Sequence, residues 1–401
     1  MAKSNWQCPS EWSEWSEWLA AGLHARNRWR LPMLLVGILF ARGRRTVTTW
    51  LRAVGISDDY ADYYYFLASV GRKTESVATQ LFLLLLRILP LPDRLLAVID
   101  DSPTKRYGPK VEGADMHHNP TIPRKRGWKF RTKLELAARL LEWLAPLVKK
   151  AGKTLWVVVD GGYSKMLFLK RAAAAGVVVV GRLRKDAALR DVPPPLRPGQ
   201  RRGRGRPRTY GKHKISLAKR AGQKRGWQSI ECTVYNKTVT KIYKTFLATY
   251  HPAGGVIRVV LVKEDDGWFP FFCTDPTVTV VEILEAFADR ATIEQDFHDI
   301  KEVWGAGQQQ VRNIWTNVAV YHLNLWMHTL VELWAWRRRH TDLCDRRDSP
   351  WDDADRRPSH ADRRKTLQRH IIRNELSTIT AVWSLPRKIL RLAQRLMALA
   401  V

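Results

Sequence analysis

The sequence predicts an α/β core that carries a β-rich insertion and lies between helical N- and C-terminal regions. Two apolar segments, Leu95–Ile99 and Leu155–Val159, have the composition of strands that are buried on both faces. The first runs directly into Asp100 and the second into Asp160. A third segment, Phe287–Lys301, has the pattern of a helix with polar residues on one face. The rest of the chain is organised around these three segments.

The chain is strongly basic. Its 401 residues include 68 Lys and Arg against 38 Asp and Glu, so the formal net charge is +30. An excess of this size indicates a polyanionic partner, with nucleic acid the usual one and an anionic membrane surface the alternative. The four cysteines have no paired spacing, which indicates neither a disulfide framework nor a zinc site. The unpaired cysteines fit a reducing cytoplasm, and the apolar runs are too short to span a bilayer, so we expect a soluble, cytoplasmic protein and no membrane partner.

Residues 1–92 are expected to be helical. Within them, Arg45–Ser57 has an apolar stripe and reaches a glycine at Gly55, and another helix is expected to begin near Asp58. Two helices joined in this way could form a helix-turn-helix that binds DNA. A small helical bundle with a basic surface is the simpler explanation.

The first part of the core extends over residues 93–190. Residues 104–131 offer almost no apolar alternation from which strands could form. A helix is expected at Thr132–Lys149, although Pro146 could end it early. A helix at Ser164–Ala175 and a strand at Val177–Leu183 are expected after the second acidic strand.

Residues 191–275 are expected to form a basic loop and a β-rich insertion. The stretch 192–227 contains no acidic residue, and its centre is Arg204-Gly205-Arg206-Pro207. This tetrad is similar to arginine hooks that enter a narrow minor groove, but general attraction to phosphate explains it as well. Turn residues separate four expected strands at Ser229–Tyr235, Thr240–Tyr250, Val256–Val262 and Trp268–Cys273.

The C-terminal part returns to the core. Residues 276–330 complete the core and contain the helix with Glu294, and Val311–Arg337 is expected to be a long helix. Residues 331–401 are expected to form a charged linker, at Arg338–Arg364, and a helical tail from Arg369 onward.

Acidic residues at the ends of two buried strands suggest a cation site. Such carboxylates repel one another and resist desolvation, so a bound metal ion is the natural compensation. Strand residues alternate between faces, so only one of Asp100 and Asp101 can point into the site. We favour Asp100 and keep Asp101 as the alternative ligand. Ordinary turn chemistry is the simpler explanation for each aspartate.

The helix at Phe287–Lys301 presents a mixed polar face. On an α-helix, Phe287, Arg290, Glu294 and Lys301 fall within about 60° of one another. A surface ion pair between Arg290 and Glu294 would also explain the spacing. The order with the cation first is the less favourable one for such a pair, which weakens that explanation.

These motifs, in this order, resemble those of the DDE cut-and-paste transposases of bacterial insertion sequences. The closest pattern is the branch whose third motif is Tyr-x2-Arg-x3-Glu-x6-Lys. Arg290, Glu294 and Lys301 match it, and Phe287 stands at the tyrosine position. The segments IDDSPTKRYGPK, HHNP and VVVDGGYSK are also similar to this branch, so the resemblance extends over residues 95–313.

The resemblance implies a ribonuclease-H-like core and a DNA transposase. Asp100, Asp160 and Glu294 would be the catalytic residues and would hold two Mg²⁺ or Mn²⁺ ions, while Arg290 and Lys301 would contact DNA phosphates. Further candidates for DNA binding are Lys105, Arg106, Arg204 and Arg206. The expected partner is double-stranded DNA, namely terminal inverted repeats and target DNA, bound by a homodimer.

Two alternatives remain open. A ribonuclease-H-like core needs two antiparallel strands between its first strand and first helix, and the chain is short between Asn119 and Gly127. A catalytically inactive, transposase-derived DNA-binding protein is therefore one alternative, and a ribonuclease-H-like DNA nuclease that does not join strands is the other. His117 and His118 are weaker candidates for metal binding, and Trp304 for stacking on a base; loop residues and core packing are the simpler explanations.

Overall fold

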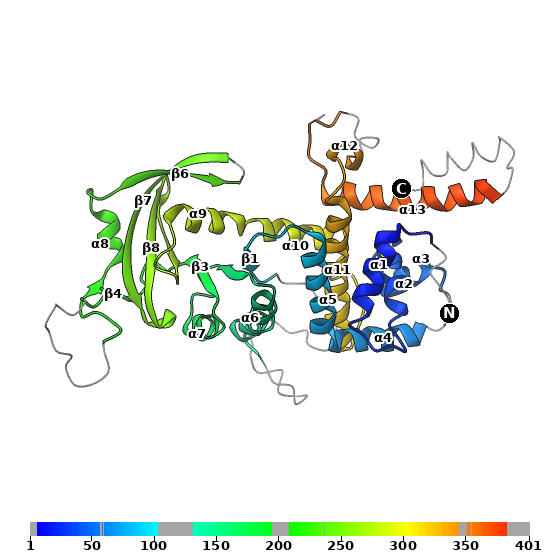
Figure 1. Cartoon of the computed structure of the whole chain (residues 1–401), viewed down its shortest axis with the longest axis horizontal. Helices are drawn as coiled ribbons and strands as arrows, with labels where there is room; N and C mark the ends of the chain where they lie inside the picture. Colours follow the sequence, from blue (N-terminus) through cyan, green and yellow to red (C-terminus); the bar gives the residue numbers. More distant parts are fainter. Residues whose placement is uncertain are drawn as a thin grey trace. The chain divides into compact units, whose positions relative to one another are not determined.

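The computed structural model describes residues 6–56, 58, 60–102, 131–194, 208–235, 237–344, 351–353 and 355–382. These residues form two compact units (Figure 1). The helical unit contains the described residues up to Pro90 and from Asp296 onward. The α/β unit contains Leu91–Ser102 and the described residues from 131 to Gln295. The mixed α/β class with helical flanks, expected of a ribonuclease-H-like protein, is confirmed.

The core of the α/β unit is a set of three parallel strands. They are β1 (Arg94–Ile99), β2 (Thr154–Val159) and β3 (Val178–Arg182). β2 pairs with β1 on one side and with β3 on the other, and Ile99 lies opposite Val159 in the register. Five consecutive residues of β2, Leu155–Val159, are buried. The continuous apolar composition of this segment is thus explained by burial on both faces.

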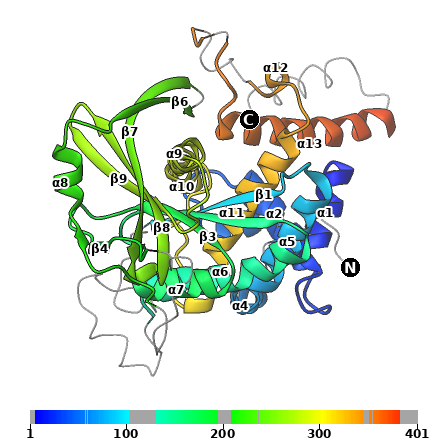
Figure 2. The same cartoon turned by 60° about the vertical axis from the view of Figure 1, so that its left-hand side comes forward.

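The insertion continues the same sheet rather than forming a separate one. In the part of the chain that the structure describes, nine strands form one sheet with the path β1-β2-β3-β9-β8-β7-β4-β5, and β6 also pairs with β7 (Figure 2). The strands of the insertion are β4 (Leu189–Arg190), β5 (Lys214–Ile215), β6 (Gln228–Val234), β7 (Lys237–Tyr250), β8 (Gly255–Glu264) and β9 (Gly267–Cys273). β9 pairs antiparallel with β3, so the insertion begins where the parallel strands end. The four strands expected here are confirmed, whereas β4, β5 and the short helix α8 (Leu217–Gly222) are additions.

Helices cover both faces of the parallel strands. The helices are α6 (Lys133–Lys150), α7 (Met166–Ala174) and α9 (Val280–Asp289). Trp156 and Val158 pack in one apolar cluster with Ile283 of α9. Alternate residues of a strand point to opposite faces, and α6 and α7 contact β2 and β3 from the other side (Figure 1). α6 starts with a capping box between Thr132 and Glu135 and continues past Pro146.

The helical unit is built around a long central helix. Its helices are α1 (Ser10–Ala20), α2 (Arg30–Phe40), α3 (Val47–Ala53), α4 (Tyr60–Arg72), α5 (Thr74–Ile88), α11 (Ile314–Ala335), α12 (His340–Leu343) and α13 (His360–Val382). Large buried side chains such as Trp12, Trp50 and Trp334 belong to one apolar core. Gly71 of α4 packs directly on α11, because a Cβ there would lie 1.8 Å from the carbonyl oxygen of Trp315.

Three expectations about the helical regions need comment. The pair α3 and α4 lies where a helix-turn-helix was expected, but the exposed face of α4 carries Asp62 and Tyr65, and DNA contact stays a prediction. The prediction of a linker at Arg338–Arg364 was wrong in part, because α12 lies within this range and α13 already begins at His360. Among the helices that the structure describes, none combines the length and hydrophobicity needed to cross a membrane.

Candidate active site

Asp100 and Asp160 emerge side by side from the parallel strands. Asp100 directly follows Ile99, and Asp160 directly follows Val159. Ile99 and Val159 are the last residues that pair between β1 and β2. Neighbouring strands are roughly 4.8 Å apart, so the two aspartates start from adjacent positions at one edge of the sheet. The backbone therefore places the two acidic residues at adjacent positions, as expected. The expectation that both strands are buried on both faces was wrong for β1, whose residues are exposed or only half-buried, whereas β2 is buried.

A glycine turn shapes the position of Asp160. The backbone N–H of Gly162 donates to Asp160 Oδ1 at 2.8 Å. A Cβ on Gly162 would lie 3.0 Å from that same oxygen and 3.4 Å from Lys133 Nζ. The absence of a side chain at Gly162 thus lets the carboxylate fold back on its own turn and leaves room for Lys133.

Arg290 joins the first and third acidic residues. Its guanidinium lies 2.5 Å from Asp100 Oδ2 and 3.5 Å from Glu294 Oε1. The side chains of Asp100 and Arg290 are 19% and 18% exposed, whereas that of Glu294 is 68% exposed. The structure therefore brings Asp100, Arg290 and Glu294 together, with the arginine between the two carboxylates.

The segment that carries Glu294 is two helices rather than one. α9 ends at Asp289, and α10 extends over Thr292–Glu302. The N–H of Glu294 donates to the carbonyl of Ala291, three residues back, so a tighter turn replaces the α-helical pattern at this point. The single helix expected from the sequence is thus wrong, although the contact between Arg290 and Glu294 survives the break.

The other residues of the third motif have separate surroundings. Phe287 packs edge-on against Phe271, with ring centroids 4.8 Å apart, and Arg290 lies over its ring at 5.8 Å. Lys301 lies in the last turn of α10, in the part of that helix that belongs to the helical unit. Phe287 is therefore a packing residue of the α/β unit that also supports the arginine.

Asp101 occupies a different environment from Asp100. Its Oδ1 accepts from Lys133 Nζ at 2.8 Å and from the Tyr163 hydroxyl at 3.1 Å, and its side chain is 57% exposed. The ammonium of Lys133 lowers the pKa of the Asp101 carboxyl, and Asp101 in turn raises the pKa of Lys133. Burial, together with the charge of Asp101, raises the pKa of the Tyr163 hydroxyl, which stays protonated as a donor.

Lys133 and Tyr163 are site residues that the sequence did not reveal. Tyr163 lies within the segment VVVDGGYSK, so its closeness to Asp160 was a usable signal. Lys133 is 32 positions from Asp101, and no local pattern links them. Only the docking of the start of α6 beside the ends of β1 and β2 brings this ammonium to the acidic residues.

Several predicted residues lie outside the described residues. They are Lys105, Arg106, His117, His118, Arg204 and Arg206, together with the stretch at 104–130, whose sequence offers almost no apolar alternation for the two further strands that a ribonuclease-H-like core needs. Trp304 is described and is fully buried, with its indole N–H bonded to His360. Packing therefore accounts for Trp304, and the idea that it stacks on a base was wrong.

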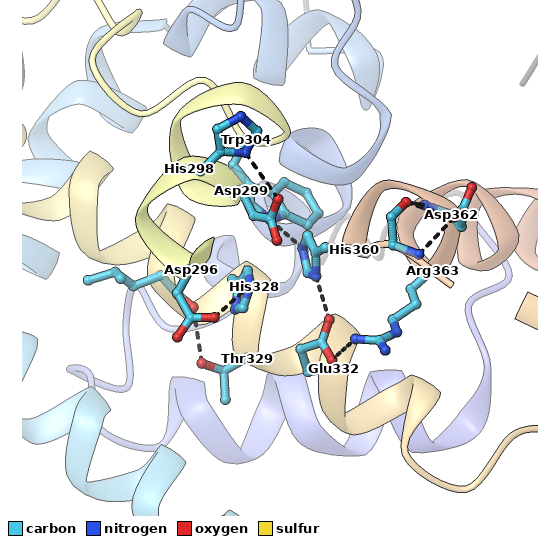
Figure 3. Close-up of polar contacts among 12 residues, drawn as sticks. Asp296, His298, Asp299, Trp304, His328, Thr329, Glu332, His360, Asp362 and Arg363 are labelled. Carbon is cyan, nitrogen blue, oxygen red and sulfur yellow. Dashed lines mark hydrogen bonds and ion pairs between the residues drawn. The ribbon is translucent and has the colours of Figure 1, made fainter. Parts of the chain in front are cut away.

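A second group of possible metal ligands lies in the helical unit (Figure 3). The ligand atoms of His328, Glu332 and His360 all lie within 4.8 Å of one another. The indole of Trp304 can only donate, and it donates to His360 Nε2 at 2.8 Å. The ring proton of His360 must therefore sit on Nδ1, which donates to Glu332 Oε1 at 2.6 Å. Both ring nitrogens of His360 are thus engaged.

The remaining contacts of this group also fit a hydrogen-bonded network rather than a metal centre. The second oxygen of Glu332 pairs with Arg363. Burial and the neighbouring His360 lower the pKa of His328 to about 4, so this imidazole is neutral at physiological pH, and its Nε2 lies 3.8 Å from Asp296. We therefore treat the group as a polar network that connects α11 with α13.

Comparisons with known proteins agree with the motifs. The family model described as "Transposase DDE domain" matches residues 131–330, and the one described as "DDE superfamily endonuclease" matches residues 19–125. The first match contains Asp160 and Glu294, and the second contains Asp100. A search of curated proteins finds no match. With both matches in the same superfamily and together extending over most of the sequence, the chain belongs to the DDE-type transposases.

Proposed function

We propose that this protein is a DNA transposase of the branch with the Tyr-x2-Arg-x3-Glu-x6-Lys motif. It would cut transposon ends by metal-dependent phosphodiester hydrolysis and join them to new DNA. The observation that carries the proposal is that Arg290 contacts acidic residues from two chain segments, at a sheet edge where a third acidic residue follows the neighbouring strand. Asp100 and Asp160 follow paired strand ends, and Arg290 bridges Asp100 to Glu294.

The donor set suits a hard divalent cation. Mg²⁺ and Mn²⁺ prefer carboxylate oxygens, and the three acidic residues supply them from three directions of the chain. Asp100, Asp160 and Glu294 would hold the two ions that the family implies, with Asp101 as the alternative ligand. Such ions activate the attacking oxygen and neutralise the charge on the leaving oxygen. The fixed turn at Gly162 supports this assignment, because it holds the Asp160 carboxylate by a backbone bond.

The proposed chemistry has two displacements at phosphorus. Water attacks the phosphodiester at the transposon end and releases a 3′-hydroxyl. That hydroxyl attacks a phosphodiester of the target strand, forms the new bond and releases a target 3′-hydroxyl. Arg290 and Lys301 would contact phosphates of the DNA, as guanidinium and ammonium groups commonly do. Both displacements occur at phosphorus, so the proposed metal ligands and the two phosphate-binding residues can serve the cutting step and the joining step alike.

The proposed partner is double-stranded DNA. The net charge of +30 favours a long polyanion, and terminal inverted repeats and target DNA are the forms that the reaction requires. A homodimer on the DNA would hold the two ends together. Within the cell, such a protein would work in the cytoplasm beside the nucleoid.

The test uses labelled DNA that carries the natural flanks of the coding region, a target plasmid and Mg²⁺ or Mn²⁺. The proposal predicts cuts at defined ends followed by joining of those ends to the plasmid. Cutting without joining would instead indicate a nuclease. Binding of the flanks without any cut would indicate an inactive DNA-binding relative. Asp160→Asn is the control, because it keeps the size of the side chain and removes one ligand charge.

A further inference from the structure

We give the name acidic cluster to Asp100, Asp101, Asp160 and Glu294. We propose that Arg290 and Lys133 are internal counter-ions of this cluster. The two cationic side chains compete with divalent metal ions for the carboxylates, and they move to DNA phosphates when the metal is bound. The inference rests on the proposed metal-dependent function and adds to it a role for two cationic side chains.

Arg290 occupies two carboxylates of the cluster. Its guanidinium contacts Asp100 at 2.5 Å and Glu294 at 3.5 Å, so it takes up oxygens that a metal ion would need. Its Nε is buried and has no hydrogen-bond partner among the described residues. Arg290 is thus only partly satisfied by the two carboxylates, and a planar guanidinium is well suited to grip a phosphate instead.

Lys133 contacts the cluster from the start of α6. Its ammonium bonds to Asp101 at 2.8 Å, and the charges of Asp160 and Asp100 also raise its pKa. Lys133 Nζ also lies near Asp160, because a Cβ on Gly162 would lie 3.4 Å from Lys133 Nζ and 3.0 Å from Asp160 Oδ1. The Lys133 side chain is 48% exposed, so it can turn toward solvent or DNA without disturbing the core.

The charges of the cluster and its two cations do not balance. Four carboxylates against two cations leave an excess of two negative charges, which attracts further cations. Two divalent ions would reverse that balance. Arg290 and Lys133 would then be repelled from the oxygens, while the phosphates of bound DNA would attract them.

The test measures Mn²⁺ binding by titration calorimetry, without DNA and at fixed ionic strength. Removal of the charge, in Lys133→Met or Arg290→Met, should tighten Mn²⁺ binding on the order of tenfold, because a nearby repelling cation is lost. DNA binding by the same variants should weaken severalfold. Lys133→Arg keeps the charge and should bind Mn²⁺ like the unmodified chain. Lys149→Met changes the same helix in its last turn, far from the cluster, and should leave Mn²⁺ binding unaltered.

The two predicted changes have opposite signs, because Mn²⁺ binding should tighten while DNA binding weakens. A residue that only holds DNA would change DNA affinity alone, and a purely structural residue would weaken both affinities; either result in Lys133→Met, or in Arg290→Met where that variant folds, would overturn the proposal. Because Lys133 is half exposed, its variant keeps the test valid even if the Arg290 variant does not fold. Equal Mn²⁺ binding by the unmodified chain and Asp160→Asn would instead contradict the proposed metal site itself.

Discussion

The buried network of the helical unit gives a quantitative prediction for Glu332. This carboxylate accepts from His360 Nδ1 at 2.6 Å and pairs with Arg363. Burial raises the pKa of Glu332, but the bonds from His360 and Arg363 outweigh burial and lower the pKa from 4.5 to about 2. Protonation of Glu332 therefore opposes folding, and its charge contributes to stability.

The size of the effect follows from the pKa difference. A fall from 4.5 to about 2 corresponds to roughly 3 kcal/mol at about 1.4 kcal/mol per pKa unit. The side chain of Glu332 is 34% exposed, so solvent screening reduces the expected contribution to about 2 kcal/mol. Because the pKa is lower in the folded state, this stability is fully present above pH 4.5. It is lost as the pH falls toward 2.

The assay is urea unfolding of the unmodified chain and Glu332→Gln at pH 7 and at pH 3. At pH 7 the variant should be less stable by about 2 kcal/mol, and the difference should shrink clearly at pH 3. Glu14→Gln is the control in the same unit, because the pair of Glu14 with Arg87 is exposed and should contribute less than about 1 kcal/mol. A Glu332→Gln difference that stays constant with pH would refute the assigned ionisation.

Two further predictions concern packing and the choice of metal ligand. In a helix, alanine is more favourable than glycine by about 1 kcal/mol. Gly71→Ala should nevertheless lower the melting temperature sharply, because the new Cβ would overlap the Trp315 carbonyl of α11. A Cβ at Gly222 meets no described atom within 4 Å, so Gly222→Ala should leave that temperature nearly unchanged. In the DNA-cutting assay Asp100→Asn should abolish metal-dependent cuts, whereas Asp101→Asn should retain part of them. The reverse order would make Asp101 the ligand.

Much of the α/β core could be predicted because burial leaves a simple record in sequence. The segment Leu155–Val159 is apolar throughout, and the structure buries all of it in β2. The ends of β1 and β2 then follow from strand pairing, which places Asp100 beside Asp160. Local composition was sufficient for β2 because both of its faces need apolar residues, and β1 has the same composition although its residues are exposed or only half-buried.

Other features depend on tertiary contacts that local patterns do not record. The tight turn after Arg290 could not be predicted from helical periodicity. Arg290 and Glu294 stay in contact across the turn, as they would in one continuous helix. The start of α13 was missed because its charged residues suggested an exposed linker. In the structure Arg364 is buried and donates to the carbonyls of Leu39 and Ala41, and Asp362 pairs with Arg356. The charged composition therefore gave a wrong prediction for the start of α13, because these charged side chains have partners elsewhere in the chain.

The most direct test of the central claim is nicking of DNA carrying the natural flanks by the unmodified chain and by Asp160→Asn, with and without Mn²⁺. Gel-shift binding of the same DNA is measured in parallel, so that a loss of cutting can be separated from a loss of DNA affinity. The acidic-cluster account predicts Mn²⁺-dependent cuts by the unmodified chain, with DNA binding retained but cutting absent in the variant. Equal cutting by both proteins would contradict it, because Asp160 would then hold no metal needed for the reaction.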